Sequence, residues 1–167
     1  MSINELQSGT CIYRQKSDFL QRLFTRPLFL SLTIGIPFCI FKLLFGITVV
    51  RVGSHVSALV SICGGVVIIW AFADLIMNLG REVYDLANRP APFEYCTIAQ
   101  AGRFFHMPMI FLAIDTLITF TIICIMLWSG WIATLTKPES YLWYAATTLN
   151  LISLSLVVLY NEIRTLQ

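Results

Sequence analysis

The fold is decided by the segment 28-LFLSLTIGIPFCIFKLLFGITVV-50, which contains a single charged residue. Segments 56–79, 107–130 and 141–160 are of similar length and similarly apolar. An α-helix rises about 1.5 Å per residue and the hydrocarbon core of a bilayer is about 30 Å thick, so about 20 residues make one crossing. The sequence therefore predicts an integral membrane protein with four spans.

Composition supports the same class. Of the 167 residues, 57% are hydrophobic and only 12% are charged, which would leave a soluble domain with too much apolar surface. Backbone groups in hydrocarbon must be paired within the span, and the alternating ten-residue strands of a barrel are not visible. We expect an all-α protein: one four-helix bundle over 28–160 with a connector at 80–106, a leader at 1–27 and a tail at 161–167.

The basic residues that flank the spans are distributed unevenly. One side would carry Arg14, Lys16, Arg22, Arg26, Arg81, Arg89, Arg103 and Arg164, and the other side Arg51 and Lys137. The positive-inside rule then places both termini and the connector on the cytoplasmic side, or in the stroma or matrix of an organelle. Trp128, Trp131, Tyr141, Trp143 and Tyr144 gather at the opposite end, where aromatic rings prefer the interface. A bacterial inner membrane or an organellar membrane is the expected location.

The leader and the connector each allow two interpretations. Residues 1–27 lack a continuous apolar core, so they do not form a cleavable signal peptide, and their amphipathic part is either a short interfacial helix or a mobile tail. In the connector, Pro90 and Pro92 interrupt any helix, so the second span should end near Asp85 and a second short helix should cover 97–105. This connector is either a docking surface or a link that lies along the lipid.

No cofactor is predicted. The five cysteines form no C-x-x-C pair, which makes a disulfide framework or a zinc site improbable. Two histidines could suggest haem, but His55 and His106 are expected at opposite faces of the membrane, roughly 30 Å apart. They cannot ligate one iron within a protomer, which leaves only a site with a single histidine or one shared with another subunit.

Lys42 is the charged residue of the first span. Counted from the expected bounds, it lies about 12 Å from the external end, too deep for its ammonium to reach water easily. Gly35, Cys39 and Gly46 share its helical face and would allow another helix to approach closely. We expect this face to pack against protein; the alternative is a lysine that extends toward the external headgroups.

A polar stripe runs down one side of the second span. It begins at Asp74 and continues through Asn78, Arg81 and Asp85, at offsets of four, seven and eleven residues. Because helical side chains tilt toward the N-terminus, Arg81 could lean back toward Asp74. The stripe predicts either an ordinary interfacial ion pair between these two residues or a functional polar site.

Asp115 lies about eight residues inside the third span, at a depth similar to that of Asp74. Two carboxylates brought together in a low-dielectric bundle would not both ionise readily, so one is expected to hold a proton, which would suit proton or cation handling. Lys42 is counted into the other leaflet, offset by roughly 10–15 Å, so no direct contact between Lys42 and Asp115 within one protomer is expected. Alternatively, Asp115 is structural and bonds Thr119 or Asn150.

Small residues indicate where the second and fourth spans meet other helices. They are Ser57, Ser61 and Gly64 in one and Ala146, Asn150 and Ser153 in the other. Each span thus combines one small or polar stripe with bulky apolar residues. This pattern predicts four helices that pack around a common interior and present large side chains to lipid.

The sequence contains no phosphate-binding loop, metal-ligand spacing or nucleophile elbow, so no enzyme is predicted. We expect a non-catalytic accessory, scaffolding or assembly subunit, whose partners are the lipid bilayer and other membrane proteins or copies of itself. The alternative is a homo-oligomeric ion or proton channel or transporter that uses Lys42, Asp74 and Asp115. A lipid- or quinone-handling enzyme would need a cluster that is not apparent. The net charge of +2 gives no reason to expect nucleic acid as a partner.

Overall fold

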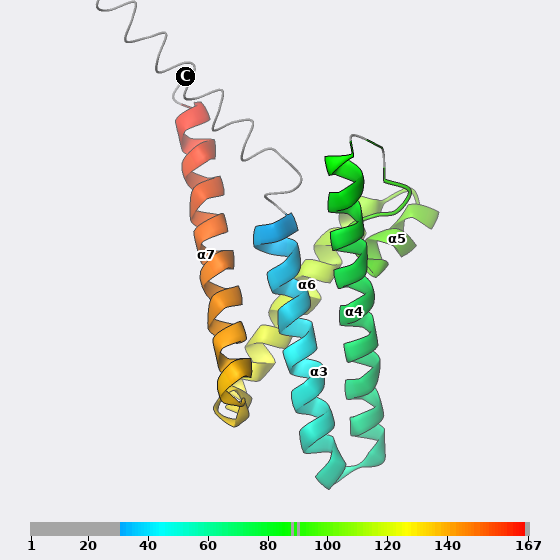
Figure 1. The fold of residues 1–167 in the computed structure, drawn as a ribbon, viewed down its shortest axis with the longest axis vertical. Helices are drawn as coiled ribbons and strands as arrows, with labels where there is room; N and C mark the ends of the chain where they lie inside the picture. The colour runs from blue at the N-terminus through cyan, green and yellow to red at the C-terminus, as the bar shows by residue number, and fades with distance from the viewer. Residues whose placement is uncertain (1–30, 88, 90, 166–167) are drawn as a thin grey trace, which may run out of the picture.

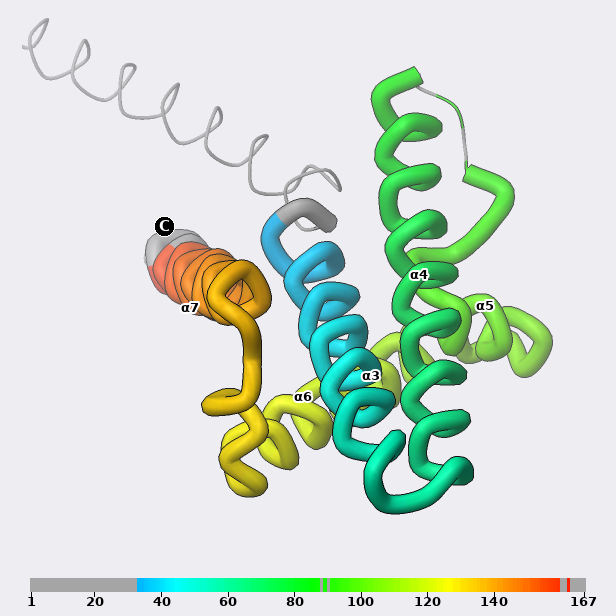
Figure 2. Tube along the Cα trace, turned by 60° about the horizontal axis from the view of Figure 1, so that its bottom comes forward, coloured from blue at the N-terminus to red at the C-terminus, as the bar shows by residue number. Residues whose placement is uncertain are grey.

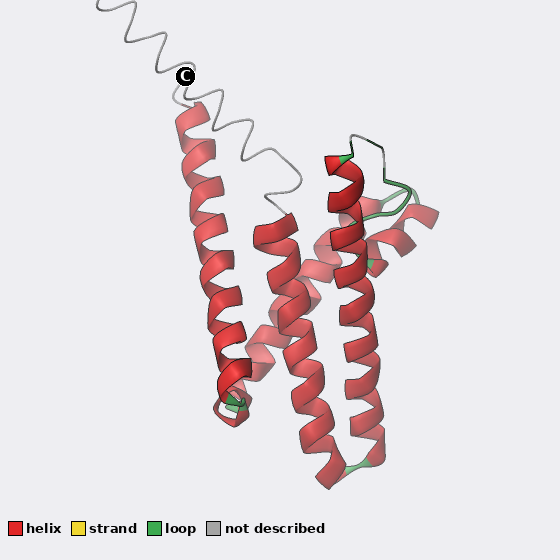
Figure 3. Ribbon diagram, in the orientation of Figure 1, coloured by secondary structure: helices red, strands yellow, loops and turns green. Residues whose placement is uncertain are grey.

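The computed structural model describes residues 31–87, 89 and 91–165, and every regular element within them is helical (Figures 1 and 3). A π-helical turn, η1, precedes the first long helix, and a 3₁₀ turn, η2, precedes the last. The elements are η1 Ser31–Gly35, α3 Ile36–Val56, α4 Ala58–Leu86, α5 Thr97–Phe104, α6 Pro108–Trp128, η2 Trp131–Thr134 and α7 Lys137–Thr165. The expected all-α class is confirmed for this part of the chain, while the leader at 1–27 lies outside the described residues.

Four helices are long and apolar enough to cross a membrane. Their apolar stretches run over Thr33–Val56, Ala58–Leu86, Pro108–Trp128 and Lys137–Leu159. The first ends six residues later than the sequence predicted, because no proline separates Val50 from Ser57 and the helix continues through Arg51 and Gly53. The second helix extends beyond the predicted segment 56–79 to Leu86, near the expected end at Asp85, and the short helix expected at 97–105 is present as α5.

Helix α3 forms the centre of the molecule. It lies between α4 and α7, with α6 crossing obliquely behind it (Figures 1 and 2). Within the apolar stretch of α3, 56% of residues are buried, against 17% to 22% in the other three. The four long helices pack together as expected, and they contribute unequally to the interior. Helix α3 supplies most of the buried residues, and Met126 of α6 and Trp143 and Ala146 of α7 complete the core.

Glycines allow α3 and α4 to approach each other closely. A Cβ atom built on Gly64 would lie 2.9 Å from the carbonyl oxygen of Gly46 and 2.8 Å from the backbone nitrogen of Val50. A Cβ atom on Gly53 would lie 2.6 Å from the backbone nitrogen of Ser61. The small residues singled out in both spans thus face each other, and the hairpin is fixed by backbone-to-backbone contact.

The connector folds back against the helices. A Cβ atom on Gly102 of α5 would lie 2.6 Å from the Cβ of Phe111, so α5 packs directly on the start of α6. The turn between them places His106 at φ 55°, in the left-handed region. Burial of Cys96 and Ala99 places one face of α5 inside the molecule. The connector is therefore packed against the long helices, and its outward role, as a docking surface or as a link along the lipid, stays a prediction.

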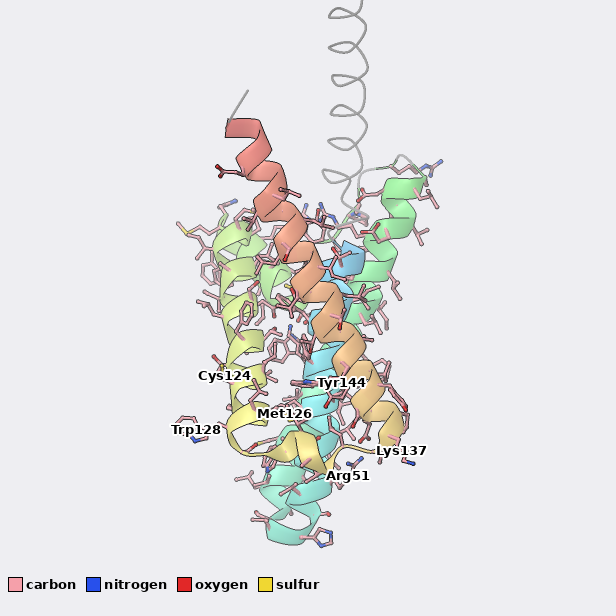
Figure 4. The ribbon with its side chains drawn as sticks, turned by 90° about the vertical axis from the view of Figure 1, so that its left-hand side faces the viewer. Arg51, Cys124, Met126, Trp128, Lys137 and Tyr144 are labelled. Atoms are coloured by element: carbon pink, nitrogen blue, oxygen red, sulfur yellow. The ribbon has the colours of Figure 1, made fainter. Side chains whose placement is uncertain are left out.

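A polar contact joins α3 to the start of α7. Arg51 donates to Glu139 Oε1 at 2.6 Å and to the carbonyl of Thr134 at 3.1 Å. Figure 4 shows Arg51 at the same end of the molecule as Lys137, with Trp128 pointing outward. The aromatic residues at this end divide between two roles. Trp128, Tyr141 and Tyr144 are exposed, whereas Trp143 packs against Phe41 and Trp131 against Phe45.

Substitution of Gly64 should separate α3 from α4. We expect Gly64→Ala to lower the free energy of unfolding by about 1–3 kcal/mol, because the new methyl group would overlap backbone atoms that cannot move independently. Gly65→Ala is the matched control, since nothing lies within 4 Å of a Cβ atom built there. Denaturation of the two reconstituted variants in sodium dodecyl sulfate measures the difference, and equal stabilities would contradict the close contact.

Candidate functional site

Three charged side chains from three helices meet inside the protein. Lys42 Nζ of α3 donates to Asp74 Oδ2 of α4 at 2.7 Å and to Asp115 Oδ1 of α6 at 2.6 Å. The side chains of Lys42 and Asp74 are each 1% exposed, and that of Asp115 is 6% exposed. We call Lys42, Asp74 and Asp115 the triad. It brings together the three charged residues that the sequence singled out within its apolar segments.

The expectation that Lys42 and Asp115 do not meet within one protomer is wrong. It rested on span bounds that ended the first helix at Val50, whereas α3 runs to Val56 and turns at Ser57. Lys42 lies fifteen residues before Ser57 and Asp74 seventeen residues after it, so the antiparallel hairpin places them at the same height. The apparent vertical offset was an error of helix boundary.

The connector supplies a further contact to the triad that the sequence did not predict. Asp74 Oδ1 accepts hydrogen bonds from both the backbone nitrogen and the hydroxyl of Thr97, each at 2.7 Å. Thr97 is the first residue of α5, where backbone N–H groups have no partner within the helix. Asp74 thus accepts three hydrogen bonds, one from a cation, which compensates much of the cost of burying its charge. The signal in the sequence was a helix start directly after the prolines, with an N–H available for an anion.

Lys42 also contacts an aromatic ring. Its ammonium lies 4.3 Å from the ring centroid of Trp70, one turn before Asp74 on α4. An ammonium over an indole face gains about 2 kcal/mol or more where water is excluded. The indole nitrogen of Trp70 has no hydrogen-bond partner in the described part of the chain. Sequence reasoning missed Trp70, although its offset of four residues from Asp74 places it on the same helical face.

The other predicted site residues do not join the triad. Arg81 does not reach Asp74: it pairs with Glu94 at 3.3 Å, and its guanidinium lies 3.8 Å from the ring centroid of Tyr95. Arg81 therefore pairs with the connector and not with Asp74, because it lies seven residues beyond Asp74 and faces the folded-back chain.

Polar residues one turn from the triad serve local packing. Asn78 is buried, donates to the carbonyl of Asp74 at 3.1 Å and contacts Gly35, as the shared face predicted. The hydroxyl of Thr119 donates to the backbone carbonyl of Asp115, 2.9 Å away, and not to its carboxylate. Asn150 is half-buried on α7 and makes no hydrogen bond with Asp115 among the described residues. Its neighbour on the same face, Ser153, is buried and bonds Thr33 at 2.9 Å.

A cavity of about 330 Å³ opens beside the triad, between α3, α4, α6 and the connector. Most of its wall is apolar, with the triad at one end. It is lined by Ile34, Gly35, Phe38, Cys39, Lys42, Asp74, Asn78, Tyr95, Cys96, Met109, Leu112, Asp115 and Thr116. Met109 is 75% exposed, so the cavity reaches the protein surface near the start of α6. The arrangement can accommodate a small molecule next to buried charges.

Cys96 lies beside these charges, outside the long helices. Its thiol accepts from the backbone nitrogen of Ala99 at 3.4 Å, which caps the start of α5. Burial raises the pKa of the Cys96 thiol to about 12, and the nearby carboxylate of Asp115 adds to the effect. A thiol with this pKa contains almost no thiolate at neutral pH and reacts slowly with electrophiles.

The comparisons with known proteins found no matching family model, no matching curated protein and no matching solved structure. Within the described residues, no group of three or more histidine, cysteine or acidic side chains could hold a metal ion.

Removal of the three charges should have unequal effects on stability. Lys42→Met would leave two buried carboxylates without their cation and should cost about 3–5 kcal/mol. Asp74→Asn should cost less, although its amide cannot accept from both Lys42 and Thr97. Asp115→Asn should change stability by about 1 kcal/mol or less, because the amide oxygen still accepts from Lys42 and the remaining pair is neutral.

The triple variant Lys42→Met/Asp74→Asn/Asp115→Asn tests the cause of this ranking. It should be more stable than Lys42→Met alone, because it removes the uncompensated charges with the lysine. Unfolding of each reconstituted protein in sodium dodecyl sulfate gives the comparison. A triple variant as unstable as Lys42→Met would contradict a charge effect and point to lost packing around the lysine chain.

Cys96 should resist alkylation in the folded protein. We expect a variant that keeps only Cys96 to react with N-ethylmaleimide at pH 8 at least tenfold more slowly than a cysteine introduced at exposed Ala87, and to react fully after unfolding. Since the folded pKa lies above the ordinary value, the stability that Cys96 contributes should be complete below pH 9 and decline as the pH rises toward 12. Equal labelling rates at the two positions would contradict the buried placement of α5.

Proposed function

We propose that this chain is a four-span integral membrane protein that acts as a non-catalytic accessory, scaffolding or assembly subunit of a membrane complex. The observation that supports this best is the triad, whose three charges are paired with each other inside one protomer. In this proposal the triad is a structural lock that fixes α3, α4 and α6.

Support for a membrane location comes from the exposed surface. Large apolar side chains are exposed along α4, α6 and α7 and at the last residue of α3. Examples are Val56 at 72%, Ile69 at 71%, Met109 at 75%, Leu117 at 65% and Leu151 at 60% exposed. A water-soluble protein rarely exposes such a continuous apolar surface, whereas lipid solvates it well. A bacterial inner membrane or an organellar membrane, with both termini and the connector on the cytoplasmic or equivalent side, remains our prediction from the basic residues.

The geometry of the triad favours a lock over a pore lining. Residues that conduct ions must meet water or the ion and release it. Lys42 is 1% exposed and has two carboxylates within hydrogen-bond distance, and Asp74 is further held by Thr97. Although Lys42 and Asp74 border the cavity, their charged atoms are held by these contacts, which would have to break before either residue could bind a permeating ion.

One observation favours the second candidate, a homo-oligomeric proton or cation channel or transporter. The triad contains two carboxylates and one ammonium, so it lacks one positive charge, and Asp115 borders the cavity. A proton or a cation could supply that charge. In this candidate, other copies of the chain would have to supply the remaining residues that line the ion path.

The state of the protein after gentle extraction tests the proposal. We expect native mass spectrometry of the detergent-extracted protein to show a stable complex with unlike membrane partners, because the internal charges leave the lipid-facing surfaces free for association. No partner among nucleic acids is expected. A homo-oligomer without other subunits would favour the pore.

Flux measurements in liposomes provide the opposing test. Under our proposal the reconstituted protein moves protons or monovalent cations no faster than empty liposomes. Asp115→Asn is the appropriate comparison, because it should preserve the fold, whereas Lys42→Met would confuse lost transport with unfolding. Flux in the unmodified protein that disappears in Asp115→Asn would overturn the structural lock.

A further inference from the structure

The charge balance of the triad leaves a demand that the described residues do not meet. Two carboxylates share the single ammonium of Lys42. Arg81 belongs to the same helix as Asp74, but its guanidinium is held by Glu94 and by the ring of Tyr95. Buried charge is tolerated where it is neutralised, so the site favours the arrival of one further positive charge.

The hydrogen bonds place this demand on Asp115. Asp74 has both oxygens occupied: Oδ2 by Lys42, and Oδ1 by two donors of Thr97. Asp115 accepts from Lys42 through Oδ1 and also bonds the neutral thiol of Cys96, so Lys42 is the one cation that reaches its carboxylate within the described residues. Its side chain keeps 6% of its exposure and borders the cavity, so a donor could approach it from there.

The cavity restricts the size and chemistry of what could arrive. Its volume of about 330 Å³ lies at the lower end of the range for ligand pockets, about 300–1,000 Å³, and holds roughly ten water-sized groups of about 30 Å³ each. The same cavity is also lined by Phe38, Leu112 and Ile34, which would solvate a hydrocarbon chain. A hydrated inorganic cation would leave these walls without contacts.

We propose that this cavity binds a small alkylammonium amphiphile, with its ammonium at Asp115 and its chain along Phe38 and Leu112. The ammonium completes the neutralisation of the triad, and the chain fills apolar volume that opens to the surface past Met109. The inference concerns a ligand of the protomer and does not depend on whether the protein is a subunit or a pore.

Octylammonium, with nine non-hydrogen atoms, matches the cavity and serves as the probe, and octanol is its uncharged counterpart of equal length. Thermal unfolding is followed in nanodiscs made only of phosphatidylcholine, at increasing probe concentration. For the unmodified protein we expect the concentration that gives a half-maximal rise in Tm to be at least tenfold lower for octylammonium than for octanol. Nonspecific partition into the lipid is the same for every variant and is subtracted by comparison.

Two variants locate the effect. Asp115→Asn, which should fold, removes the charge, so octylammonium and octanol should then give their half-maximal rise in Tm at about the same concentration. Leu112→Trp fills the cavity and should remove the response to both probes, while Leu117→Trp, on an exposed position of the same helix, is the matched control and should retain it. An unchanged preference for octylammonium in Asp115→Asn would overturn the proposal.

The same ammonium chemistry is found in a phospholipid headgroup, ethanolamine, so one further arm separates the sources. Addition of phosphatidylethanolamine to the nanodiscs should leave Tm and the octylammonium response unchanged. A rise in Tm with this lipid, accompanied by loss of the octylammonium response, would assign the site to a membrane lipid instead and overturn the free amphiphile.

Discussion

Burial of Lys42 at the centre of α3 is the constraint on which the rest of the structure depends. An ammonium inside an apolar bundle is tolerated only with partners, and here two helices each supply one carboxylate at 2.6–2.7 Å. The hydrophobic contacts of α3 would permit several rotations and shifts of its neighbours. The two ion pairs permit one, because each carboxylate must meet the same nitrogen, and this fixes the registers of α4 and α6 against α3.

Close helix packing and the folded-back connector both hold Lys42 and Asp74 in place. Gly46 and Gly64 bring the backbones of α3 and α4 close together, so that the side chains of Lys42 and Asp74 can meet without extension. The connector then closes the site from one end. Its Thr97 is bound to Asp74, and the carbonyl of its Phe93 accepts from Arg81. Packing, backbone donors and charge thus act on the same few atoms.

The sequence predicts the helical class, the four long helices, the short helix α5 and the three buried charges, because each depends on local composition or periodicity. It does not predict the central position of α3, since the other spans are equally apolar and only contacts distinguish them. The pairing of Lys42 with Asp115 was missed because helix ends are poorly encoded where no proline or polar residue stops the helix. Thr97 was missed because its role depends on the path of a connector that returns to the bundle.

The position of α7 has a consequence for the order in which the protein can assemble. Helix α7 rests on α3 and on the preceding turn η1, and contributes no atom to the triad. In chain order Lys42 comes first, Asp74 follows on α4 and Asp115 on α6, so all three members of the triad precede the start of α7 at Lys137. Every residue that pairs these charges is therefore already present in the chain before α7 begins, and α7 adds packing against α3 and η1 without adding to their neutralisation.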